Sequence, residues 1–134
     1  MAYQSFEDLE VWQHGCRLSV AIFEAFENCK RFTLRDQIER AGLSVPSNIA
    51  EGAERGSNRD FAHFSNFSKG SCGELRTQLY IARKLDELGK GSFNSLIQES
   101  REISAMLQGL RTSVLRKSTA KEMRAPRKHL KLNT

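Results

Sequence analysis

Apolar residues recur at helical spacing in four segments of the chain. The first segment begins after Ser5, whose hydroxyl is placed to cap a helix, and continues to about Asn28. Its apolar side chains are spaced three and four residues apart, which is the period of an α-helix and not of a strand. Because the chain also has only two prolines and few β-branched runs, the pattern predicts a mostly helical protein.

The second segment runs from Thr33 towards Gly56 and contains Pro46. Proline removes a backbone donor and clashes with the preceding turn of a helix. We therefore expect a kink near Val45 and a restart in which Ser47 or Asn48 supplies a capping oxygen.

The third segment starts with Ser57 as its cap and reaches Gly89, and the fourth runs from about Ser92 to Val114. Gly70 and Gly73 interrupt the third segment, and each costs about 1 kcal/mol relative to alanine in a helix. A neighbouring helix that approaches closely would compensate for that cost. Four helices joined by short turns predict an all-α fold, an antiparallel up-down-up-down four-helix bundle with a kinked second helix.

The first helix carries two apolar rows on different sides. One row contains Leu9, Trp12, Cys16, Val20 and Phe23, and the other is offset from it by roughly 200°. An outer helix of a monomeric bundle needs only one such row. We therefore assign the second row, which consists of Val11, Leu18, Ile22 and Phe26, to an oligomer interface.

Length and charge divide the chain into two parts. Its 134 residues, 39% apolar and 28% charged, suit one soluble domain without a membrane span. The net charge is +5, but residues 111–134 hold eight basic residues against Glu122 alone, and residues 1–110 hold 13 basic against 15 acidic ones. The local charges are therefore +7 and −2, and we predict a bundle over residues 1–115 and a basic flexible tail over residues 116–134.

The basic residues are the best candidates for a function. Densely spaced Lys and Arg without aromatics are typical of phosphate neutralisation without base recognition, so RNA or DNA is the expected partner. Arg55 and Arg59 lie beside the expected start of the third helix, where backbone N–H groups also favour phosphate, although Asp60 weakens the local field. The alternative for these two arginines, which we favour, is a solvated or ion-paired turn. The alternatives for the tail are a solvated extension and a segment on an anionic membrane, the latter disfavoured because its apolar residues form no continuous face. The predicted nucleic-acid-binding residues are Arg111, Arg116, Lys117, Lys121, Arg124, Arg127, Lys128, Lys131, Arg55 and Arg59.

Other chemistry finds little support in the sequence. The chain has no Glu-x-x-His pair for a di-metal site, and Gly70-Ser-Cys-Gly73 is not followed by the Lys-Ser or Lys-Thr of a phosphate loop. Three widely spaced cysteines do not form a disulfide framework, and Cys72 falls on an apolar row. We expect no metal, no cofactor and no enzymatic activity, and the absence of a signal peptide favours the cytoplasm.

Several short motifs resemble one known family. They are Phe6-Glu-Asp-Leu-Glu-Val-Trp-Gln, Ser44-Val-Pro-Ser-Asn-Ile-Ala-Glu-Gly, Asp60-Phe61, Gly70-Ser71 and Thr77-Gln-Leu-Tyr-Ile-Ala. In this order and spacing they resemble the bacterial four-helix bundle proteins first found encoded in intervening sequences of large-subunit ribosomal RNA genes. The resemblance implies a non-enzymatic homopentamer. Its relatives include the accessory variability protein of diversity-generating retroelements, which binds a reverse transcriptase and nucleic acid.

The central motif has two interpretations. Pro46, Ser47, Asn48, Glu51 and Gly52 form either a polar patch for a partner or, as we favour, a helix junction whose side chains satisfy backbone groups. At the level of function, two hypotheses follow from the sequence. The chain is either an oligomeric module that binds nucleic-acid phosphates or a scaffold that docks a partner protein, with a reverse transcriptase as one possible partner.

Overall fold

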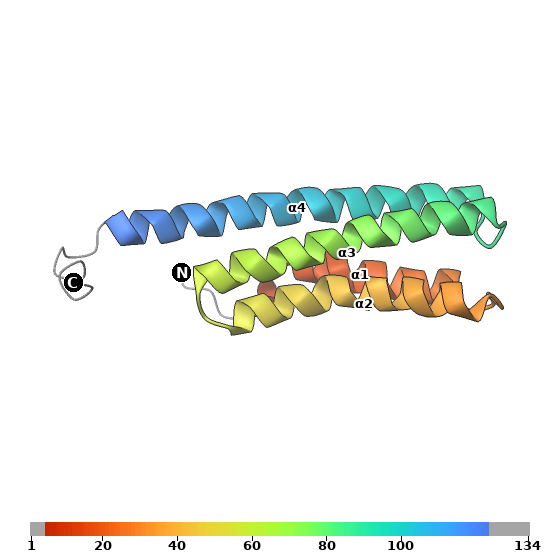
Figure 1. Cartoon of the computed structure of the whole chain (residues 1–134), viewed down its shortest axis with the longest axis horizontal. Coiled ribbons are helices and arrows are strands. Elements are labelled where there is room, and N and C mark those ends of the chain that lie inside the picture. Colours follow the sequence, from red (N-terminus) through yellow and green to blue (C-terminus); the bar gives the residue numbers. More distant parts are fainter. Residues whose placement is uncertain (1–4, 124–134) are drawn as a thin grey trace.

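The computed structural model of the chain describes residues 5–123, which form four α-helices after one short 3-10 helix (Figure 1). The elements are η1 (Phe6–Asp8), α1 (Glu10–Ala25), α2 (Phe32–Glu54), α3 (Asn58–Lys84) and α4 (Lys90–Met123). No strand occurs within residues 5–123. The predicted all-α, four-helix fold is therefore confirmed.

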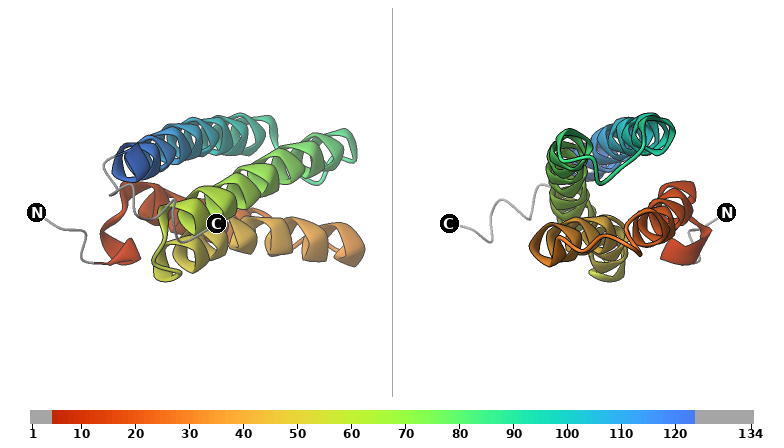
Figure 2. Two further views of the ribbon diagram at one scale, coloured as in Figure 1. Left: turned by 60° about the vertical axis from the view of Figure 1, so that its left-hand side comes forward. Right: turned by 90° about the vertical axis from the view of Figure 1, so that its right-hand side faces the viewer.

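Contacts between the helices show how they are arranged. A methyl group in place of the Gly15 hydrogen would lie 3.3 Å from Cβ of Pro46, and one at Gly42 would lie 3.6 Å from Ile22. Residues later in α1 thus contact residues earlier in α2, so the two helices run in opposite directions. Figure 2 shows the α1–α2 pair packed against the α3–α4 pair.

The core lies between the helices and contains the row that the sequence suggested for an oligomer interface. Leu18, Ile22 and Phe26 are completely buried within the single chain, and Val11 is 6% exposed. Assigning these four residues to an interface between copies was therefore wrong. The outward row of α1 is the other one, in which Val20 is 58% and Phe23 39% exposed.

Helix α2 is continuous through Pro46. The predicted restart was wrong, because neither Ser47 nor Asn48 caps a new helix. The Asn48 side-chain amide instead donates a hydrogen bond to the carbonyl of Ser44 at 2.8 Å, one turn earlier in the same helix. A bend of α2 without a break stays a prediction.

Helix α3 begins where the sequence predicted, but it ends earlier than predicted. The Ser57 hydroxyl accepts a hydrogen bond from the backbone N–H of Asp60 at 3.1 Å, which confirms the predicted cap. The helix ends at Lys84, and the chain reverses through Asp86, whose φ is +58°, before it reaches Gly89. Gly70 and Gly73 face open space, so the close approach predicted there was wrong.

Helix α4 has 34 residues and reaches past the turn between α2 and α3 (Figure 1). The segment assigned to a flexible tail begins at residue 116, but residues 116–123 are helical. The predicted tail residues Arg124, Arg127, Lys128 and Lys131 lie outside the described residues. None of the four helices, as far as they are described, is long and apolar enough to cross a membrane.

Candidate nucleic-acid interface

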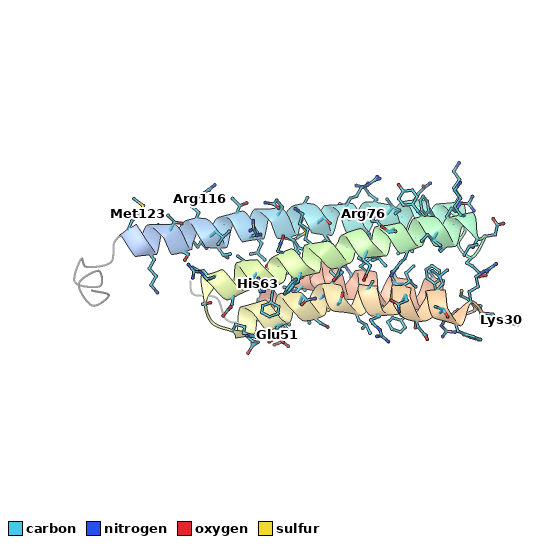
Figure 3. The ribbon with its side chains drawn as sticks, viewed as in Figure 1. Lys30, Glu51, His63, Arg76, Arg116 and Met123 are labelled. Carbon is cyan, nitrogen blue, oxygen red and sulfur yellow. The ribbon has the colours of Figure 1, made fainter. Side chains whose placement is uncertain are left out.

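Two groups of predicted binding residues lie at the same end of the bundle. Arg55 and Arg59 flank the turn between α2 and α3, and Arg116 lies on α4 near the level of this turn (Figure 3). The fold brings them together because α4 runs opposite to α3 and ends near the start of α3. The connections after α1 and α3 lie at the opposite end, where an ion pair of 3.3 Å joins Arg31 to Glu87.

The basic residues of α4 have few acidic neighbours. Arg116, Lys117 and Lys121 are exposed, and no ion pair to any of them occurs among the described residues. Arg111 is half-buried, and its Nε is buried without a hydrogen-bond partner in the described part of the chain. The last turns of α4 therefore present positive charge on a helix that the bundle covers only in part, which suits contact with phosphate.

The turn between α2 and α3 is less favourable for an anion. The Arg55 guanidinium lies 3.2 Å from the Glu51 carboxylate and 4.8 Å from the centre of the Phe64 ring, so its charge already has partners. Asp60 follows Arg59 in the first turn of α3, where a negative charge opposes a bound phosphate. Gly56, the residue after Arg55, adopts a φ of +83°, a backbone conformation that favours glycine.

The central motif lies at a packing junction. Pro46 is buried against Gly15, and a methyl group at Gly52 would approach Cβ of Phe64 to 2.8 Å. The Asn48 amide binds the backbone within α2, and Glu51 pairs with Arg55. Of the five motif residues, Ser47 and Glu51 are exposed, so most of the motif faces the neighbouring helices.

A cluster of aromatic side chains near this turn was missed in the sequence. His63 lies edge-on to Phe67, with ring centres 4.5 Å apart, and Phe64 lies 5.7 Å from Phe67. Phe67 is 51% exposed, so the cluster opens to solvent. Its signal in the sequence is the density of aromatic residues in Phe61-Ala-His-Phe-Ser-Asn-Phe67.

Groups for nucleophilic or metal chemistry are sparse in the described residues. No group of three or more His, Cys, Asp or Glu side chains able to hold a metal ion occurs in residues 5–123. Cys72 is completely buried, as its position on an apolar row predicted, and burial raises the pKa of its thiol above the usual value of 9.0. A buried thiol with a raised pKa is a poor nucleophile near neutral pH.

Comparisons with known proteins agree with the helical arrangement. The profile of the family described as 23S rRNA-intervening sequence protein matches residues 7–109. The chain belongs to this family. The resemblance found in the sequence motifs is thus confirmed, and the match to the intervening-sequence proteins ends just before the basic part of α4.

One solved structure shares the fold of this intervening-sequence family member. It is described as a protein with unknown function from the S23 ribosomal protein family of Bacteroides thetaiotaomicron. The two sequences are 23% identical, the similarity covers 75% of this chain and 97% of the other, and the TM-score is 0.72. At this identity the likeness shows the fold alone. A comparison with curated proteins gives no match.

Proposed function

We propose that the protein is a non-enzymatic, homo-oligomeric helical module that binds RNA or DNA phosphates through the basic end of α4. The observation that carries this proposal is the charge division: +7 over residues 111–134 against −2 over residues 1–110. The exposed Arg116, Lys117 and Lys121 place part of that charge on a helix. A concentrated positive field of this kind attracts nucleic acid largely without regard to sequence.

Self-association is supported by the outward row of α1. Trp12 and Cys16 are half-buried, and Val20 and Phe23 are exposed. A row of large apolar side chains on the surface of a small protein is typical of a contact surface. We propose that this row is covered by other copies of the chain, and the family resemblance implies a pentamer. Several basic ends on one particle would then bind a long nucleic acid by avidity.

The function can be tested by removing charge at one end of the bundle. In the R116Q/K117Q/K121Q variant we expect weaker binding to RNA, and a slope of log K against log salt that is smaller by up to about 0.7 to 0.9 per lost phosphate contact. Glutamine substitution is preferable to truncation after Leu110, because truncation would remove the buried Val114. The measurement is fluorescence anisotropy over a series of salt concentrations.

The matched control removes three charges at the opposite end. In K30Q/K84Q/K90Q the substituted lysines are exposed, and Lys30 lies at the far end of the bundle from Arg116 (Figure 3). If binding depends on the basic end, this control keeps most of the affinity. Equal losses in both variants would mean that only net charge matters, and unchanged binding in the first variant would contradict the proposal.

A second candidate function is favoured by the exposed aromatic cluster. His63, Phe64 and Phe67 next to Arg55 offer an apolar surface with one cation, which is a common composition for protein contacts. In this alternative the chain is a scaffold for a partner protein, such as a reverse transcriptase. Reversing the charge of Arg116, Lys117 and Lys121 would then leave capture of the partner intact, also after nuclease treatment.

A further inference from the structure

The surface between α3 and α4 carries basic side chains whose partners are neutral. Lys69 donates a hydrogen bond from Nζ to the amide oxygen of Gln108 at 2.7 Å. Arg76 donates from Nη1 to the hydroxyls of Ser100 and Ser104, both at 3.0 Å. Arg111 follows Gln108 by three residues and therefore lies on the same side of α4. We call the surface defined by Lys69, Arg76, Tyr80, Arg101 and Arg111 the α3–α4 seam.

No counter-ion is present for these cations within the described residues. The four ion pairs found there join His14 to Glu10, Arg31 to Glu87, Arg35 to Glu39 and Arg55 to Glu51, and none involves a residue of the seam. A partly buried arginine needs acceptors for its N–H groups, and a carboxylate is one such acceptor. Arg76 is instead held in place by serine oxygens, which fix its position and leave its charge uncompensated.

Two acidic residues of α4 have contacts other than the seam cations. Glu99 lines a groove between α4 and α1 together with Ala21 and Ala25. Glu102 accepts a hydrogen bond from Gln98 at 3.2 Å, one turn earlier in α4. The seam cations therefore have no carboxylate within ion-pair distance in the described residues, although residues 1–110 carry a net charge of −2.

An aromatic ring lies at one end of this row of cations. Tyr80 is 49% exposed, and its ring packs edge-on against Phe93 with ring centres 5.0 Å apart. Arg101 donates from Nη2 to the Tyr80 hydroxyl at 3.5 Å. The ring is thus held by two neighbours while the residue remains about half exposed to solvent.

The seam has the length of a short stretch of nucleic acid. Lys69 and Arg76 are seven residues apart on α3, roughly 10 Å, and Arg101 and Arg111 are ten apart on α4, roughly 15 Å, at about 1.5 Å per residue. At about 3.4 Å per nucleotide along one strand of a duplex, this length corresponds to roughly three to five phosphates. Figure 3 shows Arg76 on the middle part of this surface, and α4 continues from there to Arg116 at the basic end.

We propose that the α3–α4 seam binds single-stranded nucleic acid, with phosphates on Lys69, Arg76, Arg101 and Arg111 and one unpaired base stacked on Tyr80. This inference rests on the proposed function and adds to it a second contact surface and a preference for unpaired strands. A track of cations beside an exposed aromatic ring is the general arrangement by which proteins bind single strands without sequence specificity. A duplex would bind through the cations alone, because its bases are already stacked and paired and cannot stack on Tyr80.

The first experiment compares two double variants of the full chain, each losing one Lys and one Arg. K69Q/R101Q removes charge from the seam, and R116Q/K121Q removes the same charge from the basic end. Binding to a fluorescein-labelled oligouridylate is measured by anisotropy over a salt series, with circular dichroism to verify folding. We expect K69Q/R101Q to bind about tenfold more weakly, with a slope of log K against log salt smaller by about 1.4 for two lost contacts.

The second experiment tests the stacking role of Tyr80. Tyr80→Leu keeps an apolar side chain but removes the aromatic face, and we expect affinity for the single strand to fall about five- to tenfold. Affinity for an RNA duplex of the same length should be unchanged, and Tyr80→Phe should bind both ligands as the wild type does. An equal loss of affinity for the single strand and the duplex would overturn the assignment of Tyr80 as a stacking residue.

The outcomes separate this inference from the proposed function. If K69Q/R101Q keeps wild-type affinity and slope while R116Q/K121Q loses both, the seam proposal is overturned and binding at the basic end stands. If the wild-type protein binds neither the single strand nor the duplex, the proposed function itself fails. Lys69, Tyr80 and Arg101 have exposed or half-exposed side chains, so their substitution leaves the buried core intact.

Discussion

At the scale of single residues, Gly52 lies where α2 approaches α3 too closely for a larger side chain. A methyl group at Gly52 would lie 2.8 Å from Cβ of Phe64 and 3.3 Å from Cα of Phe61. Alanine is favoured over glycine in a helix by about 1 kcal/mol, but overpacking costs about 1 to 3 kcal/mol. Since Phe61 contributes a backbone atom, α3 as a whole would have to move, and we expect Gly52→Ala to lower the free energy of unfolding by up to about 2 kcal/mol.

The matched control is Gly73→Ala in α3, where a methyl group would meet no atom within 4 Å. There the helix preference acts alone, so this variant should be more stable than the wild type by up to about 1 kcal/mol. Urea denaturation followed by circular dichroism measures the free energy of unfolding of both variants. Two variants with the same change in stability would contradict the close contact at Gly52.

At the scale of the elements, the overhanging end of α4 should behave differently from the rest. Val114 is the last buried residue of α4, and residues 116–123 extend past the turn between α2 and α3. Two turns of helix without neighbours are marginally stable in water, so this segment should open locally. Among the trypsin sites of residues 5–123, we expect limited treatment to cleave first after Arg116, Lys117 or Lys121, as identified by mass spectrometry.

The rest of the bundle should survive this cleavage. Arg76 and Arg101 are equally possible trypsin sites, but they lie in helices that pack along the bundle. The trimmed protein should therefore melt cooperatively near the temperature of the intact chain. Early cleavage at Arg101, or loss of the cooperative transition after trimming, would show that α4 is less firmly docked than the structure indicates.

Periodicity in the sequence predicted four helices and the Ser57 cap, because these depend on residues close together in the chain. It did not show which row of α1 faces inward, since both rows are apolar and the choice depends on where α2 and α4 lie. The end of α4 was placed too early because its apolar pattern fades while the helix continues. The α3–α4 seam was also beyond the sequence, because Arg76 and its serine partners are 24 and 28 residues apart.

At the scale of the whole molecule, substitutions in the two rows of α1 should have different effects: one row stabilises the fold of the single chain, and the other is proposed to hold copies together. Val20 and Ile22 are two residues apart, yet Val20 is 58% exposed and Ile22 is completely buried. A carboxylate at Ile22 would be placed in the core without a partner, at a cost of several kcal/mol. Ile22→Glu should therefore unfold the chain, with loss of helicity by circular dichroism.

Val20→Glu tests whether the outward row is covered by other copies. On the surface of a single chain this carboxylate would be hydrated and the fold would be retained. Between copies it would be desolvated, and two such groups facing each other would also repel. We expect Val20→Glu to keep wild-type helicity and to sediment as smaller particles than the wild type. If it sediments with the wild-type protein at equal concentration, the row that includes Val20 and Phe23 is not the contact between copies.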